Sequence, residues 1–298
     1  MLYRAYDLTI DSDIDLQLPA AKGEVDIVLK ETQFTLPKLH QTLIYRKGVR
    51  AQFGQNDTCI FLHWPELANF KMTGGSVLEY EKLTDDEDVF RLFALSEALG
   101  VVLFQRNLFL LHGSAVQVGE KATVFIGRPG AGKSTTLSAF AQQEHAILSD
   151  DLTAIWFDAA GQPFVLPGFP QVKIWESAVD NLGFDKNLLQ PAFEGHNKFL
   201  YQQPLSVFPT TLVPLHQIII LQRPYSQKVG KLKLIESPIE LFRHFPLPPR
   251  LLKGAVLQRH FEDCIRLVKA VNILKMRRPR NFNLLKKWVK QQVVSAEG

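Results

Sequence analysis

The chain carries Gly127-Arg128-Pro129-Gly130-Ala131-Gly132-Lys133-Ser134, a run that matches the phosphate-binding pattern G-x-x-x-x-G-K-[ST]. Apolar residues 122–126 precede the run and predict a strand, while residues 134–141 after it predict a helix. Glycine lets such a loop curl until its backbone N–H groups face phosphate oxygens, and the helix N-terminus adds a partial positive charge. The run and its flanks therefore predict a P-loop, a nucleotide-phosphate site between a strand and a helix.

Each residue of the motif has an expected contact with a nucleotide. Lys133 would reach the β- and γ-phosphates, and the Ser134 hydroxyl would bind Mg²⁺. The predicted donor site therefore needs ATP and Mg²⁺ as cofactors. Its nucleotide-binding residues are Gly127, Arg128, Pro129, Gly130, Ala131, Gly132, Lys133, Ser134 and Thr135.

The composition is that of an ordinary globular protein. Of the 298 residues, 46% are hydrophobic and 21% are charged, which excludes disorder over most of the length. The net charge of +4 is too weak to predict a nucleic-acid partner. A late basic cluster is expected to be the solvated face of a terminal helix, or else a site for an acidic partner. Its members are Lys275, Arg277, Arg278, Arg280, Lys286, Lys287 and Lys290.

Two features favour the cytoplasm. The two cysteines, Cys59 and Cys264, form neither a disulfide framework nor a CxxC metal pair, so a reducing compartment is expected. The first residues lack a basic segment followed by an apolar run, and no apolar run approaches the length that crosses a membrane. A cytoplasmic protein without a membrane partner is therefore expected.

The sequence predicts two domains. Residues 1–83 contain short β-rich runs separated by turns and predict a small N-terminal β-rich domain. Thr84-Asp85-Asp86-Glu87 matches a capping box, and the apolar spacing over residues 89–99 predicts the helix that follows it. Residues 84–298 are then the P-loop domain with C-terminal helices, so the predicted fold class is α/β.

The second domain is expected to surround the loop with strands. A hairpin of residues 108–118 and 121–126 leads into the loop, and a short strand at 146–148 ends in Asp150-Asp151. Residues 160–210, rich in proline, glycine and aromatic residues, predict irregular structure around a site. The remaining expected elements are a strand at 217–221 and helices at 241–244, 251–270 and 283–294.

Asp150 and Asp151 predict the acidic part of the site. An apolar strand that ends in acid suits a carboxylate beside Mg²⁺ and the γ-phosphate. Successive strand residues point in opposite directions, so one carboxylate would face the metal and the other the acceptor hydroxyl. Two exposed acids in a turn are the alternative. The short spacing from Lys133 argues against ABC-type and recombinase-type ATPases, and the lack of Asn-Lys-x-Asp argues against small GTPases.

Three segments together resemble the catalytic domain of bacterial HPr kinase/phosphorylase: Leu111-His112-Gly113, the P-loop, and Leu148-Ser149-Asp150-Asp151. That family phosphorylates a serine of a carrier protein, and its P-loop fold is shared with the phosphoenolpyruvate carboxykinases. The resemblance covers residues 85–155 well. It implies that Asp151 is the general base for the acceptor hydroxyl and that Asp150 binds the metal or supports the base. It also implies that Lys133 and His112 act at the transferred phosphate.

Two departures from the family pattern bear on the substrate. The family's metal-holding segment Glu-Ile-Arg-Gly-Leu-Gly is replaced by residues 167–176, in which Glu176 is only a weak substitute. Residues 6–19 resemble the opening of HPr-kinase-related proteins, some of which phosphorylate lasso-peptide precursors. The resemblance therefore implies an acceptor other than HPr. Because the named family forms hexamers, a homo-oligomer is a further expectation.

The expected function is an ATP- and Mg²⁺-dependent kinase that transfers the γ-phosphate to a serine of a peptide or small protein, such as a ribosomally made precursor. Three alternatives stay open: a small-molecule hydroxyl kinase, a non-catalytic nucleotide-binding regulator, and a relative that uses pyrophosphate or GTP. Further candidates for phosphate or peptide contacts, or else surface residues, are Lys173, Lys198, Arg223 and His196.

Overall fold

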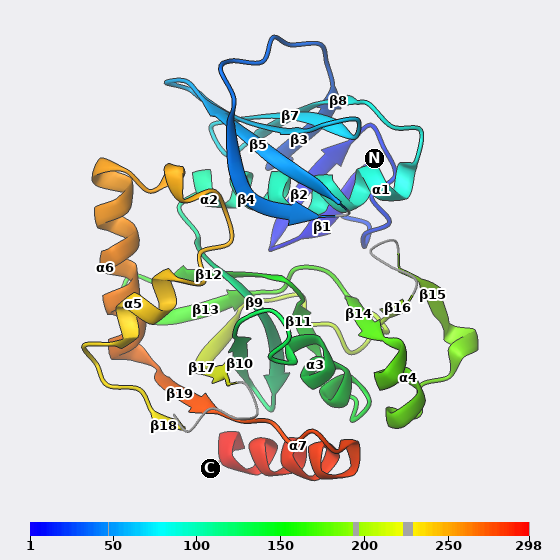
Figure 1. Cartoon of the computed structure of the whole chain (residues 1–298), viewed down its shortest axis with the longest axis vertical. Helices are drawn as coiled ribbons and strands as arrows, with labels where there is room; N and C mark the ends of the chain where they lie inside the picture. The colour runs from blue at the N-terminus through cyan, green and yellow to red at the C-terminus, as the bar shows by residue number, and fades with distance from the viewer. Residues whose placement is uncertain (47, 193–196, 223–228, 298) are drawn as a thin grey trace.

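The structure, a computed structural model, describes residues 1–46, 48–192, 197–222 and 229–297. An N-terminal sheet lies above a second large sheet, with helices beside both (Figure 1). The mixed α/β class predicted from the sequence is confirmed. His196 and Arg223, two of the candidate residues, lie outside the described residues.

The N-terminal sheet contains the β-rich runs that the sequence predicts, extended to eight strands. They are β1 Leu2–Ala5, β2 Leu8–Ser12, β3 Ile27–Glu31, β4 His40–Arg46, β5 Val49–Gln55, β6 Cys59–Trp64, β7 Ala68–Thr73 and β8 Val77–Lys82. Their order is β1-β2-β3-β8-β7-β6-β5-β4, with parallel pairing only on the two sides of β3. Alternating residues of β7 and β8 enter the core, as half-buried strands require.

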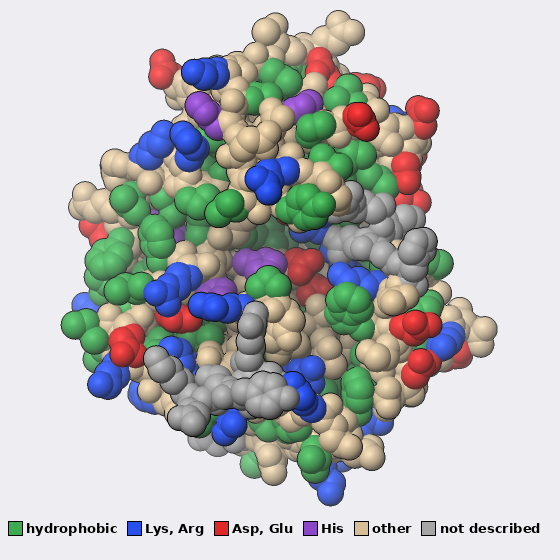
Figure 2. Space-filling model, in the orientation of Figure 1, with side chains coloured by type: hydrophobic (Ala, Val, Ile, Leu, Met, Phe, Trp, Pro, Cys, Tyr) green, Lys and Arg blue, Asp and Glu red, His purple; other side chains and the backbone are tan. Residues whose placement is uncertain are grey.

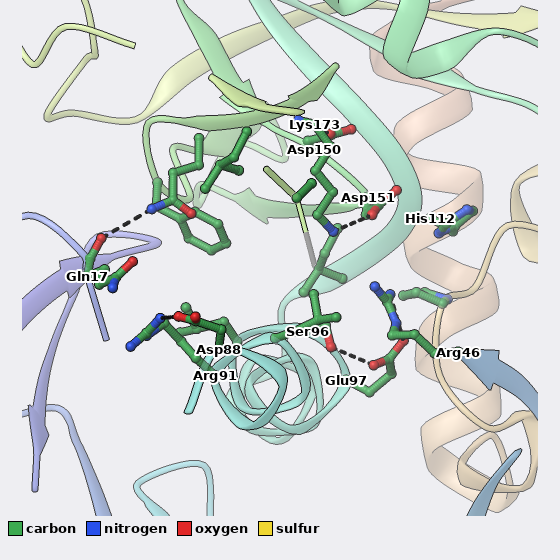
Figure 3. A pocket seen from close by; sticks show the side chains of 18 of the residues that line it. Gln17, Arg46, Asp88, Arg91, Ser96, Glu97, His112, Asp150, Asp151 and Lys173 are labelled. Carbon is green, nitrogen blue, oxygen red and sulfur yellow. Dashed lines mark hydrogen bonds and ion pairs between the residues drawn. The ribbon is translucent and has the colours of Figure 1, made fainter. Parts of the chain in front are cut away.

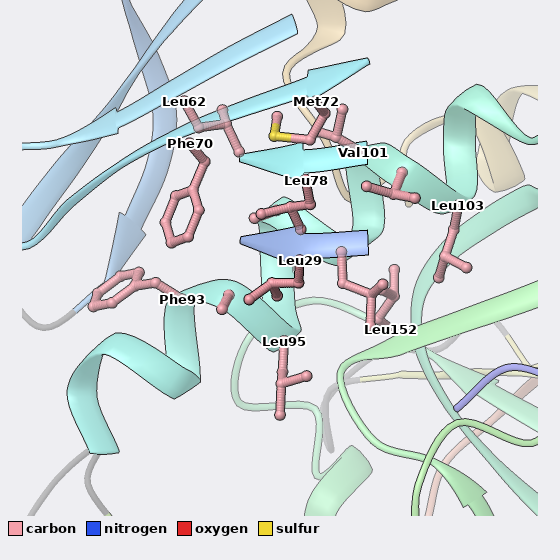
Figure 4. Packing of buried hydrophobic residues seen from close by; sticks show 14 of the residues in the cluster. Leu29, Leu62, Phe70, Met72, Leu78, Phe93, Leu95, Val101, Leu103 and Leu152 are labelled. Carbon is pink, nitrogen blue, oxygen red and sulfur yellow. The ribbon is translucent and has the colours of Figure 1, made fainter. Parts of the chain in front are cut away.

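A helical segment packs on one face of this sheet. It consists of α1 Glu87–Phe93, the π-helical turn η1 Ala94–Ala98 and α2 Leu99–Gln105. Figure 4 shows its side chains against those of β6 to β8, and the Trp64 and Phe93 ring centroids lie 4.5 Å apart. The same buried cluster includes Leu152 of the second sheet. The domain boundary after residue 83 stays a prediction.

The helix begins differently from the predicted capping box. Asp86, not Thr84, is the N-cap residue, and its carboxylate accepts hydrogen bonds from the backbone N–H groups of Asp88 and Val89. Thr84 instead accepts a hydrogen bond from the N–H of Asp86, within the turn before the helix. The helix therefore starts two residues later than the motif suggests, because an aspartate carboxylate caps as well as a threonine hydroxyl.

The second sheet carries the glycine-rich loop. Its strands are β9 Phe109–Val118, β10 Lys121–Ile126, β11 Ile147–Ser149, β12 Leu152–Phe157, β13 Pro163–Leu166, β17 Val213–Leu221, β18 Gly230–Lys231 and β19 Asn272–Met276. β9 and β10 form the predicted hairpin, and the predicted strand at 217–221 is the second half of β17. β10, β17 and β19 are parallel neighbours, so their carboxyl ends meet at one edge beside the loop.

Helices cover both faces of this sheet (Figure 1). Phe125 and Ile219 pack with residues of α3 Lys133–Ala141, α4 Glu176–Leu182 and α7 Phe282–Glu297. Val124 and Ile218, which point the other way, pack with residues of α5 Ser237–Phe242 and α6 Gly254–Ala270. Burial on both faces explains why Val124 to Ile126 of β10 and Ile218 to Leu221 of β17 are apolar without a break. The three predicted C-terminal helices are confirmed with shifted ends.

The prediction of irregular structure over residues 160–210 is wrong. Apart from β13 and α4, the segment contains a three-stranded sheet of β14 Gln171–Trp175, β16 Lys198–Gln202 and β15 Leu189–Pro191. Prolines and glycines stand mainly between these short elements. Val172 and Ile174 are buried in the cluster that includes α3 residues, and this tertiary packing stabilises the strands. β19 was also not predicted, because five residues between two helices carry little pattern of their own.

Tyr6 connects the N-terminal sheet to the second sheet. Its backbone N–H donates to the Pro167 carbonyl at 2.8 Å, and its buried hydroxyl donates to the Leu152 carbonyl at 3.1 Å. Its ring edge lies against Gly168, where an added Cβ would come within 3.0 Å of the Tyr6 ring. The turn after β1 is thereby held beside Asp151, the residue before Leu152.

Replacing Tyr6 by Phe should lower the free energy of unfolding by about 1.5 kcal/mol, because the buried Leu152 carbonyl loses its donor. Urea unfolding measures the change. Tyr45→Phe is the matched control, because the Tyr45 side chain is exposed. Equal stability of the two variants would show that the Tyr6 hydroxyl adds nothing.

Candidate functional site

The glycine-rich loop, residues 127–134, turns sharply between β10 and α3. Gly130 and Gly132 have φ of 79° and 97°, in the left-handed region that favours glycine. A Cβ on Gly127 would lie 2.8 Å from the Leu221 carbonyl oxygen, so the loop also needs glycine where it passes β17. The tip at Arg128, Pro129 and Gly130 is exposed, while Ala131 is buried. The loop thus presents backbone to solvent at the N-terminus of α3, where Ser134 and Thr135 occupy the first turn.

Lys133 is almost fully buried beneath this loop, with 9% of its surface exposed. Its Nζ donates to the Gly127 carbonyl at 3.1 Å and lies 3.4 Å from His112 Nε2. Burial lowers the pKa of Lys133, and the charges of Asp151 and Asp150 oppose that shift. The lysine therefore links the loop to His112, and the charges of the acidic pair act on it.

Asp150 and Asp151 follow β11 but do not continue it. The strand ends at Ser149, and Asp151 has φ of 67°. Both carboxylates contact Lys173: Asp150 accepts from its backbone N–H at 3.2 Å, and Asp151 binds its Nζ at 3.1 Å. The prediction that the two point in opposite directions is wrong, because it assumed extended backbone through both residues.

The two carboxylates have opposite proton affinities. Burial, followed by the negative charge of Asp151, raises the pKa of Asp150 to about 6. Burial opposes ionisation of Asp151 too, but the positive charges of Lys173 and Arg46 outweigh it and hold the pKa of Asp151 well below its usual range. When the pair binds one proton, that proton is on Asp150. Asp151 stays ionised at neutral pH.

His112 is the side chain that Lys133 Nζ contacts on β9. Its backbone N–H donates to the His244 carbonyl at 2.6 Å, which ties β9 to the turn after α5. Burial, followed by the charge of Lys133, lowers the pKa of His112, so the imidazole is neutral at pH 7. The structure thus brings together all four residues expected to be catalytic: His112, Lys133, Asp150 and Asp151.

A cavity of about 130 Å³ opens beside the acidic pair. His112, Asp150, Asp151 and Lys173 line one wall, and side chains of the N-terminal strands and of the α1–η1 segment line another (Figure 3). On the molecular surface, histidine and acidic side chains lie in a hollow at the centre of one face (Figure 2). The cavity therefore joins the two sheets at the catalytic candidates.

Arg46 and Glu97 are wall residues that sequence reasoning missed. Arg46 Nη2 lies 3.0 Å from Glu97 Oε1, and both side chains are largely buried, with 17% and 11% exposed. Ser96 donates a further hydrogen bond to Glu97 at 2.6 Å. Neither residue stands in a motif, and Arg46 is far from the loop in the chain. Only the packing of the two sheets brings this pair to Asp151.

The other candidates divide clearly. Lys173, which alone resembled a surface base, lines the cavity and binds Asp151. Lys198 lies over the Trp175 ring, with Nζ 4.7 Å from the centroid, and does not line the cavity. Glu176 is exposed in the first turn of α4 and is not among the residues that line the cavity.

The donor set suits Mg²⁺ only together with phosphate oxygens. Among the described residues, no group of three or more histidine, cysteine or acidic side chains forms a metal cage. Mg²⁺ sites on nucleotides need only one or two carboxylates, a hydroxyl and phosphates. Asp150 accepts bonds from Ser114 Oγ at 3.0 Å and from the Lys173 N–H, each on a different oxygen, and keeps lone pairs for a metal. Asp150, which lines the cavity, and Ser134, in the first turn of α3, have the oxygen donors that such a site takes.

No protein-family model matches the chain, and no curated protein matches it. Among solved structures, the chain is similar to the Hpr(Ser) kinase/phosphatase from Coxiella burnetii at 13% sequence identity and a TM-score of 0.34. That match covers 63% of this chain and 99% of the other. In the described part of the chain, no helix has the length and apolar character of a membrane span.

Proposed function

We propose that the chain is an ATP- and Mg²⁺-dependent kinase that transfers the γ-phosphate to a serine hydroxyl of a peptide or small protein, with a P-loop domain of the HPr kinase / phosphoenolpyruvate carboxykinase type. The observation that carries the proposal is that Lys133 contacts the Gly127 carbonyl of the glycine-rich loop and also His112, which lines the same cavity as the acidic pair. A phosphate on the loop and a hydroxyl in the cavity would meet at Asp151.

The chemistry assigned to these residues is direct transfer. The acceptor oxygen bonds to the γ-phosphorus as the bond to the β–γ bridging oxygen breaks, which leaves ADP, and the hydroxyl proton passes to Asp151. Lys133 stabilises the charge on the phosphoryl oxygens, and neutral His112, which lies beside the lysine Nζ, holds the lysine in position. Ser134 and Asp150 would hold Mg²⁺, which when bound neutralises charge on the β- and γ-phosphates.

The size of the cavity supports an extended peptide as acceptor. With a volume of about 130 Å³ the cavity has room for a serine side chain. A serine on a flexible segment can enter such a space, with the rest of the segment outside. The same size also favours the second candidate, a small hydroxylated metabolite that enters whole.

Transfer from γ-labelled ATP with Mg²⁺ tests the proposal. The acceptors are serine-containing peptides, a folded protein with surface serines, and free serine or other small hydroxy compounds. Label on peptides supports the proposal, and label only on a small compound establishes the metabolite kinase instead. Tight ATP binding without transfer to any acceptor would favour a non-catalytic regulator.

The Arg46–Glu97 pair should affect the acceptor and not the donor. Arg46→Met is expected to lower kcat/KM for the acceptor about tenfold and to leave ATP affinity unchanged. The reason is that the pair lines the cavity, whereas the residues of the glycine-rich loop do not. Steady-state kinetics and calorimetry measure the two quantities.

Two further variants control this test. Arg50→Met changes an exposed arginine of the same sheet and should match the wild type. Arg46→Met with Glu97→Gln removes both charges, so it avoids a buried unpaired carboxylate that could unfold the protein. Wild-type acceptor kinetics in the folded double variant would refute a role for the N-terminal sheet in acceptor binding.

A further inference from the structure

Arg278 packs directly against the glycine-rich loop. It follows β19, the parallel neighbour of β17, and therefore lies at the same carboxyl edge as the loop. A Cβ added to Gly132 would lie 2.7 Å from Cζ of Arg278, so the guanidinium occupies the space that a side chain would take. The sequence placed this arginine in a basic cluster, expected to be a solvated helix face or else a site for an acidic partner. In the structure Arg278 precedes α7 and is not on the helix.

Within the part of the chain that the structure describes, no acidic side chain forms an ion pair with the guanidinium. Its Nη1 donates to the Pro279 carbonyl at 2.9 Å, but its buried Nε has no hydrogen-bond partner among the described residues. Burial, followed by the charge of Arg280, lowers the pKa of Arg278. A cation beside the N-terminus of α3 also faces the positive end of the helix dipole. A partly buried charge in such surroundings is normally paired, and both the loop and the arginine select an anion.

We propose that Arg278, which packs against Gly132 of the loop, binds the α- and β-phosphates of the nucleotide. This inference rests on the proposed nucleotide site and adds a residue that the loop motif does not contain. Gly132 lies in the part of a P-loop whose backbone surrounds the α- and β-phosphates. A planar guanidinium suits two phosphate oxygens at once, and its Nε–H and Nη–H groups are the donors that such contacts use.

A purely structural role predicts different behaviour. If Arg278 only filled space between the loop and the C-terminal segment, its removal would destabilise the free protein and change nucleotide binding indirectly. An anion-binding role predicts the reverse. Arg278→Met removes an uncompensated charge, so the free protein should unfold at the same temperature or higher, while the rise in Tm on adding ADP should shrink.

The test is titration of the full chain with ATP, ADP and inorganic pyrophosphate, by calorimetry and by thermal unfolding. Arg278→Met should weaken ATP and ADP about thirtyfold alike, the range of a charge-assisted hydrogen-bond pair, and Arg278→Lys should fall between. Arg277→Met, an exposed neighbour, should stay within about twofold of the wild type because it changes only the distant field.

The outcomes separate this inference from the proposed function. Wild-type affinities in Arg278→Met would overturn the role of Arg278 and leave the kinase proposal standing, as would a lower Tm of the free variant with a normal rise in Tm on adding ADP. The wild type could bind pyrophosphate but neither nucleotide, and Arg278→Met could lose pyrophosphate binding. That result would support the anion-binding role of Arg278 and refute ATP as the phosphoryl donor. If the wild type binds none of the three, both fail.

Discussion

Replacing Asp151 by Asn should lower phosphoryl transfer about a thousandfold while ATP affinity stays within about threefold. The amide has the shape of the carboxylate but accepts no proton at neutral pH. The carboxylate that it replaces is ionised, since Lys173 and Arg46 hold the pKa of Asp151 low against the effect of burial. An ionised group beside the cavity is in the state that a proton acceptor requires.

Initial rates with γ-labelled ATP and calorimetric titration of ATP measure the two quantities. Asp158→Asn is the matched control, because Asp158 lies just after β12 and its carboxylate accepts a hydrogen bond from the Gln162 N–H of its own turn. A transfer rate near that of the wild type in Asp151→Asn would remove Asp151 from the proposed chemistry. Loss of the fold is a separate matter, since thermal unfolding of both variants reports it directly.

Replacing Lys133 by Met should lower the rate of phosphoryl transfer about a thousandfold or more and weaken ATP binding about tenfold. Its Nζ, with the Gly127 carbonyl and His112 as neighbours, is the cation that the loop places nearest the acidic pair. Because this ammonium is already desolvated, methionine keeps the buried stem and the variant should be no less stable than the wild type.

Lys121→Met, at the exposed start of β10, is the control for this lysine, and it should leave both quantities unchanged. The same rate assay and titration apply. If Lys133→Met transferred phosphate normally, the loop would not be the donor site, and the P-loop interpretation would fail with it.

Residues of the site that stand in short local motifs could be found from the sequence, whereas residues that come from distant segments could not. The loop was predictable because its glycines, lysine and serine are adjacent, and a strand before it and a helix after it carry strong local patterns. The Asp150-Asp151 pair was predictable for the same reason, as a short apolar strand that ends in acid. Their directions were not, because Asp151 turns with positive φ and no pattern encodes that turn.

Residues 160–210 show the opposite case. Proline and glycine signals there indicated loops, yet β14 and β16 pair along five residues each. Strand pairing depends on a partner distant in the chain, and single-sequence patterns do not register it. Lys173 stayed either a candidate for phosphate or peptide contacts or a surface residue for the same reason: a lysine in a short strand carries no sign of the Asp151 carboxylate that it binds.

The sequence by itself determined what short contiguous runs can encode: a glycine-rich loop between a strand and a helix, with its lysine and its hydroxyl, and a short strand that ends in two acids. Only the tertiary structure decided which residues complete the site. Arg46 and Glu97 come from the N-terminal sheet and its helix, and Arg278 comes from the last parallel strand. The physical reason is that backbone turns and helix caps depend on neighbours in the chain, whereas a cavity wall and a counter-charge depend on which surfaces pack together.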